Sequence, residues 1–149
     1  MFQLGFETEK NVTGWLNSGD NTFLRSGIKY DEKTGYFRVT TSGLYAVYSN
    51  LAFRCPSTSD CKDKDSISIY KQTIVVVNSV TRYERHPLKE TRARLTNLTK
   101  YSNMVCYNSK LFAVLDLSAQ DNVYIRAKPQ CLIMRGNRES FFGIYKIWQ

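Results

Sequence analysis

The amino-acid sequence predicts an antiparallel all-β domain. Apolar residues recur with a period of two rather than 3.6, and turn-forming residues interrupt them at short intervals. The 149-residue chain is 42% hydrophobic and 13% aromatic, and this composition is neither disordered nor fibrous. Such a length fits one domain, residues 1–149, which would bury about 70% of the surface of its unfolded chain.

The first strands are expected at residues 36–40 and 44–53, with turn-forming segments at 31–35 and 41–43. Side chains alternate along a strand, so 44–53 has two distinct faces. One face carries Tyr45, Val47, Leu51 and Phe53, and the other carries Ala46, Tyr48, Asn50 and Ala52. Because both faces are largely uncharged, we expect the second face to meet another subunit or a covering loop.

Further strands are expected at 66–77, 110–117, 122–128 and 140–148. The last segment is apolar and must pair inside a sheet to be tolerated. Residues 88–97 follow Pro87 and show helical spacing of apolar residues, but ten residues do not distinguish a helix from a strand. We interpret them as a strand.

No grouping of residues supports catalysis. The sole histidine, His86, lies in a polar, turn-like stretch and is interpreted as a solvated loop residue rather than a catalytic base. No CxxC pair of a zinc site, phosphate loop or dinucleotide fingerprint occurs. We therefore predict that the protein is not an enzyme and has no cofactor and no metal site.

Positive charge exceeds negative charge, with 21 Lys and Arg against 13 Asp and Glu and a net charge of +8. The segment 82–100 is rich in cations: Arg82, Arg85, Lys89, Arg92, Arg94 and Lys100. In a strand, Arg92 and Arg94 would share a face and could bind phosphate, a sulfated glycan or an acidic protein. The alternative is a solvated outer strand. Nucleic acid is not expected, because only Tyr83 and Tyr101 flank this stripe.

Several features favour an oxidising, extracellular compartment. Four cysteines, Cys55, Cys61, Cys106 and Cys131, can pair in three ways, and Asn11 and Asn97 begin N-glycosylation sequons. The chain has no apolar run of the length of a spanning helix and no signal-peptide pattern at its start. A targeting segment would therefore be missing from this sequence.

Four segments resemble the tumour necrosis factor ligand family in order and spacing. They are Trp-Leu-Asn at 15–17, Gly-Leu-Tyr-Ala-Val-Tyr-Ser-Asn-Leu-Ala-Phe at 43–53, Leu-Asp-Leu-Ser-Ala-Gln-Asp-Asn-Val-Tyr-Ile at 115–125, and Phe-Phe-Gly-Ile-Tyr-Lys-Ile at 141–147. Together they span nearly the whole chain. The resemblance implies a ten-stranded jelly-roll sandwich that assembles as a homotrimer and binds cysteine-rich receptors in the grooves between subunits.

The resemblance also implies roles for particular residues. The trimer interface would contain Ala46, Tyr48, Asn50 and Phe141, and Phe112 would fill space near the threefold axis. Lys110 departs from the aromatic residue that the family usually carries near that axis. Tyr83 matches a receptor-facing loop position, and Arg82, Arg85 and His86 would accompany it. The protein would then be a trimeric cytokine, either secreted or the ectodomain of a membrane-anchored ligand.

Two other interpretations stay open. The complement-type globular head domain has a similar fold, and its Tyr-Asp-x-x-Thr-Gly-x-Phe stretch resembles residues 30–37. Such a head binds surface or matrix targets. A monomeric carbohydrate-binding jelly roll or hydrolase would need a cluster of exposed aromatics or carboxylates, which the sequence does not show.

The implied sandwich topology places all four cysteines at one end of the domain. Two pairings follow from it. We expect Cys55–Cys61 with Cys106–Cys131, because a short loop closes readily. The second pairing is a family-like bridge from the loop containing Cys55 and Cys61 to Cys106, with the remaining cysteines joined.

Overall fold

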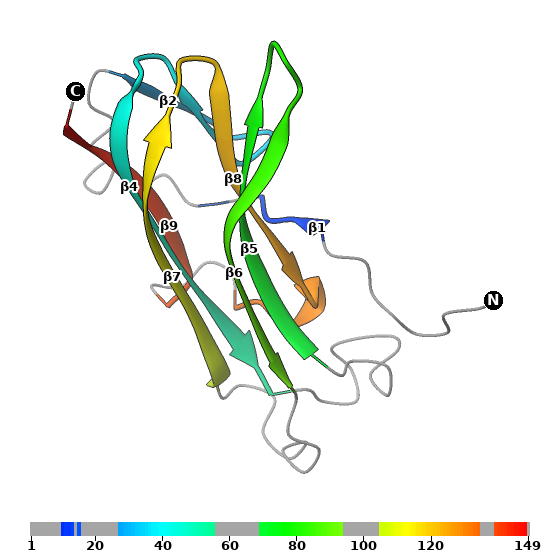
Figure 1. Ribbon diagram of the computed structural model, residues 1–149. Coiled ribbons are helices and arrows are strands. Elements are labelled where there is room, and N and C mark those ends of the chain that lie inside the picture. The colour runs from blue at the N-terminus through cyan, green and yellow to red at the C-terminus, as the bar shows by residue number, and fades with distance from the viewer. Residues whose placement is uncertain are drawn as a thin grey trace.

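Nine antiparallel strands in two facing sheets make up the part of the chain that the structure, a computed structural model, describes: residues 10–13, 15, 27–55, 69–93, 105–134 and 139–148 (Figure 1). The strands are β1 (Lys10–Asn11), β2 (Ile28–Asp31), β3 (Tyr36–Val39), β4 (Gly43–Arg54), β5 (Ile69–Asn78), β6 (Glu84–Ala93), β7 (Val105–Leu117), β8 (Asp121–Lys128) and β9 (Phe141–Trp148). The short 3-10 helix η2 covers Gln130–Leu132.

The larger sheet has the order β2-β3-β8-β5-β6, with β1 added beside β8, and the smaller sheet has the order β7-β4-β9. Strands that follow one another in the chain, such as β4 and β5 or β7 and β8, lie in different sheets. This arrangement is the jelly-roll sandwich that the resemblance implies. Each long strand expected from the period-two pattern is present.

Residues 88–97 were the one segment with helical spacing, and their described part lies in a strand. β6 begins at Glu84, before Pro87, and pairs with β5 alone at the edge of the larger sheet. An edge strand tolerates proline because one side of the strand needs no backbone donor. Pro87 also lies where the β5–β6 register shifts, between Ile74 and Val76.

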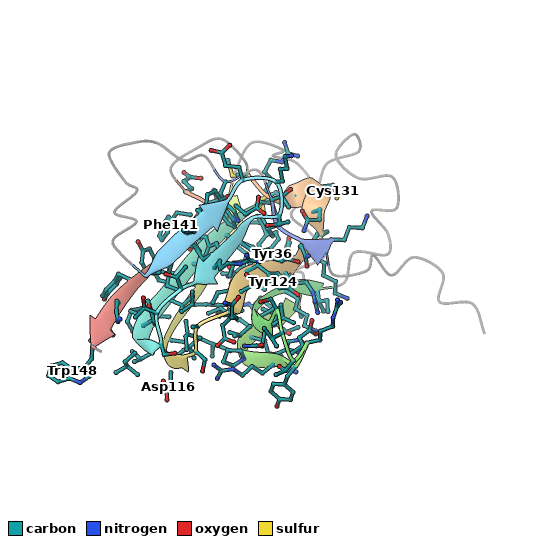
Figure 2. All side chains as sticks on the ribbon, turned by 90° about the horizontal axis from the view of Figure 1, so that it is seen from above. Tyr36, Asp116, Tyr124, Cys131, Phe141 and Trp148 are labelled. Atoms are coloured by element: carbon teal, nitrogen blue, oxygen red, sulfur yellow. A yellow bond between two sulfur atoms is a disulfide. The ribbon has the colours of Figure 1, made fainter. Side chains whose placement is uncertain are left out.

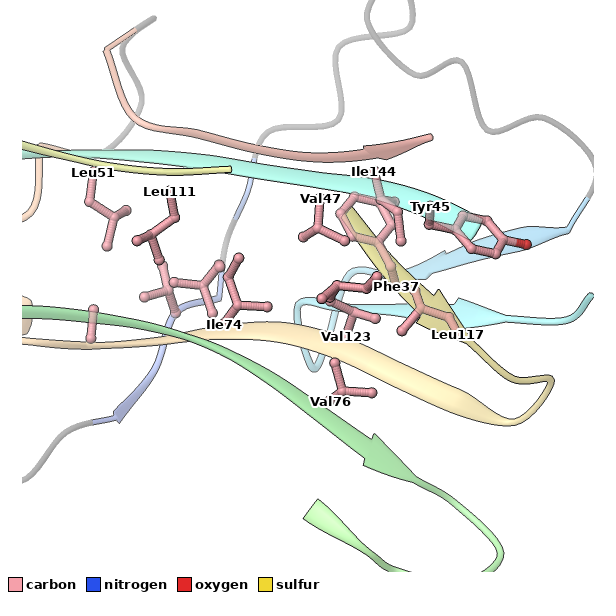
Figure 3. Close-up of a cluster of buried hydrophobic side chains, with 14 of the residues drawn as sticks. Phe37, Tyr45, Val47, Leu51, Ile74, Val76, Leu111, Leu117, Val123 and Ile144 are labelled. Atoms are coloured by element: carbon pink, nitrogen blue, oxygen red, sulfur yellow. The ribbon is translucent and has the colours of Figure 1, made fainter. Parts of the chain in front are cut away.

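The hydrophobic core lies between the two sheets, as predicted from the alternation in β4. Tyr45, Val47, Leu51 and Phe53 are fully buried on one face of that strand. Apolar side chains of the larger sheet meet this face from the opposite side, as Figure 3 shows for Phe37, Ile74, Val76 and Val123. Burial of this apolar surface is the main stabilising contribution to the fold.

One polar network crosses this core. Gln72 on β5 is fully buried, and its Nε2 donates to the carbonyl oxygen and to Oγ of Ser109 on β7, at 2.9 Å each. Ser49 Oγ on β4 donates to Oε1 of the same glutamine. Because every bond joins one sheet to the other, the network fixes their relative position.

A disulfide joins Cys55, which follows β4, to Cys106 on β7. The preferred pairing of Cys55 with Cys61 and of Cys106 with Cys131 is therefore wrong. β4 and β7 pair along their whole length up to Arg54 opposite Val105, so the ladder brings the two cysteines to a Cα–Cα distance of 4.9 Å. Cys131 is also disulfide-bonded, and Cys61 lies outside the described residues.

The expected clustering of cysteines at one end of the domain holds for the described ones. Arg54, next to Cys55, donates from its guanidinium to the carbonyl oxygen of Cys131 at 2.8 Å. Phe53 and Ile133 also form an isolated β-bridge. The end of β4, the start of β7 and the segment after β8 therefore meet at the same pole.

Candidate functional site

The outward face of the β7-β4-β9 sheet carries apolar side chains that the core does not use. We call this set the apolar face; its members are Tyr48, Phe112, Val114, Phe141 and Tyr145. The register makes the set contiguous, because Ala46 on β4 lies opposite both Val114 on β7 and Tyr145 on β9. Soluble monomers rarely expose an extended apolar patch, so this face is the leading candidate for an interface.

Tyr48 lies at the centre of the apolar face. Its ring centroid is 6.2 Å from that of Phe141 and 6.2 Å from that of Tyr145, both on β9. Between those two residues, Gly143 lies directly opposite Tyr48, and a Cβ atom on Gly143 would come within 2.2 Å of the tyrosine Cζ and Oη. Glycine therefore lets the ring lie against the backbone of β9.

Phe141 and Phe112 are accessible to a partner. Their side chains are 47% and 59% exposed, respectively, and Phe112 lies opposite Tyr48 on the other neighbouring strand. Figure 2 shows Phe141 and Trp148 on the β9 side of the molecule, away from Tyr36 and Tyr124. Both phenylalanines thus lie on the same outward face of the β7-β4-β9 sheet as Tyr48.

Ala46 and Asn50 are on the same face but contribute little accessible surface. Ala46 is fully buried between its neighbours, and Asn50 donates from Nδ2 to the carbonyl oxygen of Glu139 and to Oδ1 of Asn108. Lys110, the residue that departs from the family pattern, is exposed and lies opposite Asn50. The lysine therefore borders the aromatic cluster rather than entering it.

Sequence reasoning missed Val114 and Tyr145, which are 49% and 48% exposed. The period-two alternation of side chains along each strand could have identified both residues. Val114 follows Phe112 by two residues, and Tyr145 follows Phe141 by four, so each shares a face with a predicted interface residue. Ile147 and Trp148 are also exposed at the end of β9, next to a register shift.

A second candidate region is the loop between β5 and β6, residues 79–83. Asn78 organises it: its Oδ1 accepts from the backbone N–H groups of Val80 and Thr81, and its Nδ2 donates to Asp121. Arg82 adopts a left-handed φ of 61°. At the loop's end, Tyr83 is 69% exposed although its backbone is fixed by a hydrogen bond to Asn78. The loop therefore presents an exposed tyrosine on a preorganised turn.

Arg85 and His86, the other residues expected to face a receptor, point in different directions. The Arg85 guanidinium donates to the carbonyl oxygen of Asp116 on β7 at 2.8 Å. His86 Nε2 lies 2.9 Å from Oε2 of Glu84. The structure thus brings Arg82 and Tyr83 together in the loop, whereas Arg85 is engaged with β7 and His86 with Glu84 of its own strand.

Glu84 also binds Arg126 on β8, whose guanidinium lies 3.3 Å from its carboxylate. Hydrogen bonds from His86 and from Arg126 hold the pKa of Glu84 below its usual value. Arg126 donates to the hydroxyl of Tyr124 at 2.8 Å, and burial raises the pKa of that tyrosine to about 12. The Tyr124 ring stacks on Tyr36 of β3, with centroids 4.4 Å apart (Figure 2).

Asn11, one of the two sequon asparagines, is exposed on β1, and its Nδ2 lies 3.3 Å from the Tyr36 hydroxyl. Asn97 is outside the described residues, as is Arg94. Arg92 is described, and its guanidinium lies 5.5 Å from the Tyr107 ring centroid. Because Arg94 is not described, the structure does not test whether Arg92 and Arg94 form a basic stripe.

No helical segment among the described residues has the length and apolar character needed to cross a membrane. No group of three or more His, Cys, Asp or Glu side chains among them could hold a metal ion.

The strand order of the two sheets defines the class of this protein as an antiparallel jelly-roll sandwich, and one sheet has an exposed apolar outer face. Comparison with known proteins gives the family. The model of the TNF (Tumour Necrosis Factor) family matches residues 13–147, nearly the whole chain. The chain therefore belongs to the TNF family.

Individual relatives agree with this assignment. The chain is 30% identical over 126 residues to tumor necrosis factor ligand superfamily member 6 of Mus musculus, a match that covers 85% of the chain and 41% of that protein. The Macaca nemestrina protein of the same name is 27% identical over 128 residues, covering 83% of the chain and 40% of that protein. The chain thus spans about two fifths of the length of these curated relatives.

A solved structure described as Eiger TNF from S. frugiperda superimposes with a TM-score of 0.57 at 18% identity, over 80% of this chain and 68% of that one. At that identity the likeness supports the fold alone. The family match favours a TNF-like ligand over a complement-type head domain or a monomeric carbohydrate-binding jelly roll.

Proposed function

We propose that this protein is a trimeric TNF-like cytokine that binds and clusters cysteine-rich cell-surface receptors outside the cell. The observation that carries the proposal is the apolar face of the β7-β4-β9 sheet. Three copies that buried this face around a threefold axis would cover Tyr48, Phe112 and Phe141. Obligate interfaces are apolar in this way and resemble a domain core cut in half.

The receptor would bind in the groove between two subunits, with Tyr83 as its main contact. An exposed tyrosine on a preorganised loop supports this role, because large aromatic side chains dominate interface energetics and an ordered loop loses little entropy on binding. Arg82 lies beside it and would contribute to the association rate. Arg85 would act by joining β6 to β7 and His86 by its contact with Glu84 on the same strand, since both already have partners on this chain.

Binding to purified receptor ectodomains tests the proposal. We expect Tyr83→Ala to weaken binding by about 2 kcal/mol or more and to leave the trimer intact. Lys33→Ala, in the turn between β2 and β3, is the matched control and should bind like the wild type. Unchanged affinity of Tyr83→Ala would exclude this loop as the anchor.

The proposed extracellular location includes N-glycosylation of Asn11 and Asn97. Exposure of Asn11 on a two-residue strand supports a glycan there. We also retain a sulfated glycan as a proposed partner, and within segment 82–100 the described cation that faces outward from the larger sheet is Lys89.

A further inference from the structure

The outward face of the β7-β4-β9 sheet carries a charged residue on β7 and an aromatic residue on β9 at both of its ends. Each outward residue of β4 is paired with one residue of β7 and one of β9, so the face consists of rows. In the order β7, β4, β9, the four rows are Asp116, Leu44 and Trp148; Val114, Ala46 and Tyr145; Phe112, Tyr48 and Gly143; and Lys110, Asn50 and Phe141.

The four side chains of the two end rows are available to a partner. Lys110 and Asp116 are exposed, and neither side chain has an ion-pair or hydrogen-bond partner within the described ranges. Arg85 binds the backbone carbonyl of Asp116, which leaves the carboxylate unused. Phe141 and Trp148 are also exposed, and Figure 2 shows Trp148 projecting from the end of β9.

The shape of this face determines how three copies can cover it. β4 has 12 residues and is therefore about 40 Å long, whereas the three strands together are only about 10 Å across. A strip of that shape is covered along its whole length only when the threefold axis runs roughly parallel to the strands. Rotation about such an axis keeps each row at the same height, so a row of one subunit meets the same row of the next.

A threefold interface is heterologous, which means that two different patches of each subunit meet. Rotation about the axis brings the β7 side of one subunit beside the β9 side of its neighbour. Lys110 then lies in the same row as Phe141 of the partner subunit. At the other end of the face, Asp116 lies in the same row as Trp148 of the partner subunit.

We propose that two contacts between subunits, Lys110 with Phe141 and Asp116 with Trp148, fix the register of the trimer. An ammonium group is attracted to the face of an aromatic ring, and a buried indole N–H donates to an acceptor such as a carboxylate. A slip by one row in either direction carries one of the two charges beyond the last row of β9, so both contacts form only in the aligned trimer. The inference rests on the proposed trimeric function.

The middle rows agree with this alignment in the size of their side chains. Val114 of one subunit meets the larger Tyr145 of the next, and Phe112 meets Gly143, which has no side chain. The ring of Tyr48 lies over Gly143, so Phe112 packs against an aromatic ring there. The larger side chain thus alternates between β9 and β7, as in surfaces that interdigitate.

Mixed trimers test the contact of Lys110 with Phe141. Lys110→Glu replaces the attraction to the ring by repulsion, and Phe141→Lys places two cations in one row, so each variant alone should associate at least tenfold more weakly than the wild type. In a mixture, the new carboxylate of one variant faces the new ammonium group of the other. We expect native mass spectrometry, with one variant isotopically labelled, to give a ratio of mixed trimers to homotrimers at least tenfold above that of random assembly.

The matched control is a mixture of Lys29→Glu with Phe141→Lys. It contains the same charges, but Lys29 lies on β2 in the other sheet and is exposed there. In this mixture the unchanged Lys110 still faces the new cation of the partner subunit. The ratio of mixed trimers to homotrimers should therefore not exceed that of random assembly.

Acrylamide quenching tests the contact of Asp116 with Trp148 without a charged variant. In the Trp15→Phe background Trp148 is the sole tryptophan, and it is 72% exposed on the isolated subunit. In the trimer we expect it to be quenched at least threefold less than free N-acetyltryptophanamide. Adding Asp116→Ala should increase the quenching, whereas Glu32→Ala in the turn after β2 should not.

Two results would overturn the inference. The first is a mixture of Lys110→Glu and Phe141→Lys that assembles no better than the control mixture. The second is a trimer in which Trp148 is quenched as freely as the reference compound; this measurement decides alone where a charged variant does not fold. A monomeric mass of the wild-type chain in sedimentation equilibrium would instead refute the proposed function, so the two failures are distinguishable.

Discussion

At the scale of single residues, Gly143 and Tyr48 depend on each other. The tyrosine ring occupies the space that a Cβ atom on Gly143 would need, so the sequence requires glycine in the middle of an apolar strand. The contact aligns Tyr48 with Phe141 and Tyr145, and the central ring of the apolar face is thereby fixed by backbone packing.

We expect Gly143→Ala to lower the free energy of unfolding by about 1–3 kcal/mol, the usual cost of overpacking. Denaturant titration at a fixed protein concentration measures this cost. Adding Tyr48→Ala should remove most of it, because the smaller side chain frees the space beside β9. Strictly additive effects in the double variant would show that the two residues do not compete for this space.

Glu84 gives a residue-scale prediction that depends on pH. Its partners lower its pKa in the folded state, so its ion pairs stabilise the fold above the ordinary carboxyl pKa of 4.5, and this contribution is lost as pH falls through the lower folded value. We expect Glu84→Gln to reduce stability at pH 7 by no more than about 1 kcal/mol, because a side chain that is 38% exposed is screened by solvent.

The difference from the wild type should shrink as pH falls below 4.5 and through the lower folded pKa of Glu84, because both proteins become neutral at this position. Thermal unfolding at a series of pH values measures it. Glu32→Gln, in the turn after β2, serves as the control for a change of one charge. A stability difference for Glu84→Gln that did not shrink in the acid range below pH 4.5 would contradict the proposed role of the ion pairs.

At the scale of elements, the disulfide joins two strands that the ladder already pairs. Cys55 and Cys106 are 51 residues apart in sequence, so the bridge closes a long loop of the unfolded chain. We expect Cys55→Ser with Cys106→Ser to cost about 2–4 kcal/mol of stability. A chemical unfolding curve measures the loss.

A non-reducing peptide map tests the pairing itself. Cleavage before Asp60 separates Cys55 from Cys61, so a linked peptide containing Cys55 and Cys106 is unambiguous. A peptide linking Cys55 to Cys61 would refute the bridge. The variant Cys106→Ser alone should release a titratable thiol at Cys55.

At the scale of the whole molecule, assembly and folding should be coupled. We expect Tyr48→Asp to dissociate the trimer and to destabilise the subunit, because the variant places a charge among Phe141 and Tyr145 on the apolar face. Sedimentation equilibrium gives the mass, and Lys33→Asp provides a control at an exposed turn. A soluble, folded trimer of Tyr48→Asp would exclude this face as the interface.

The sequence by itself determined the fold class, because a period of two needs no knowledge of distant contacts. The two faces of β4 could be assigned from residues 44–53 alone, and the motifs at 115–125 and 141–147 placed the jelly-roll strands in order. Local alternation fixes which side chains of one strand share a face. The grouping of Tyr48 with Phe112 and Phe141, which lie on other strands, came from the family resemblance and not from alternation.

Only the tertiary structure decided which residues from separate strands meet. Sequence spacing favoured a bridge from Cys55 to Cys61, whereas strand pairing brought Cys55 to Cys106. A local charge count offered a stripe of Arg92 and Arg94 only as the alternative to a solvated outer strand, whereas cross-strand register placed Lys71 opposite Lys128. The physical reason is the same in both cases. Short loops and local charge runs can be identified from the sequence alone, but the register between distant strands is set by packing of the whole sandwich.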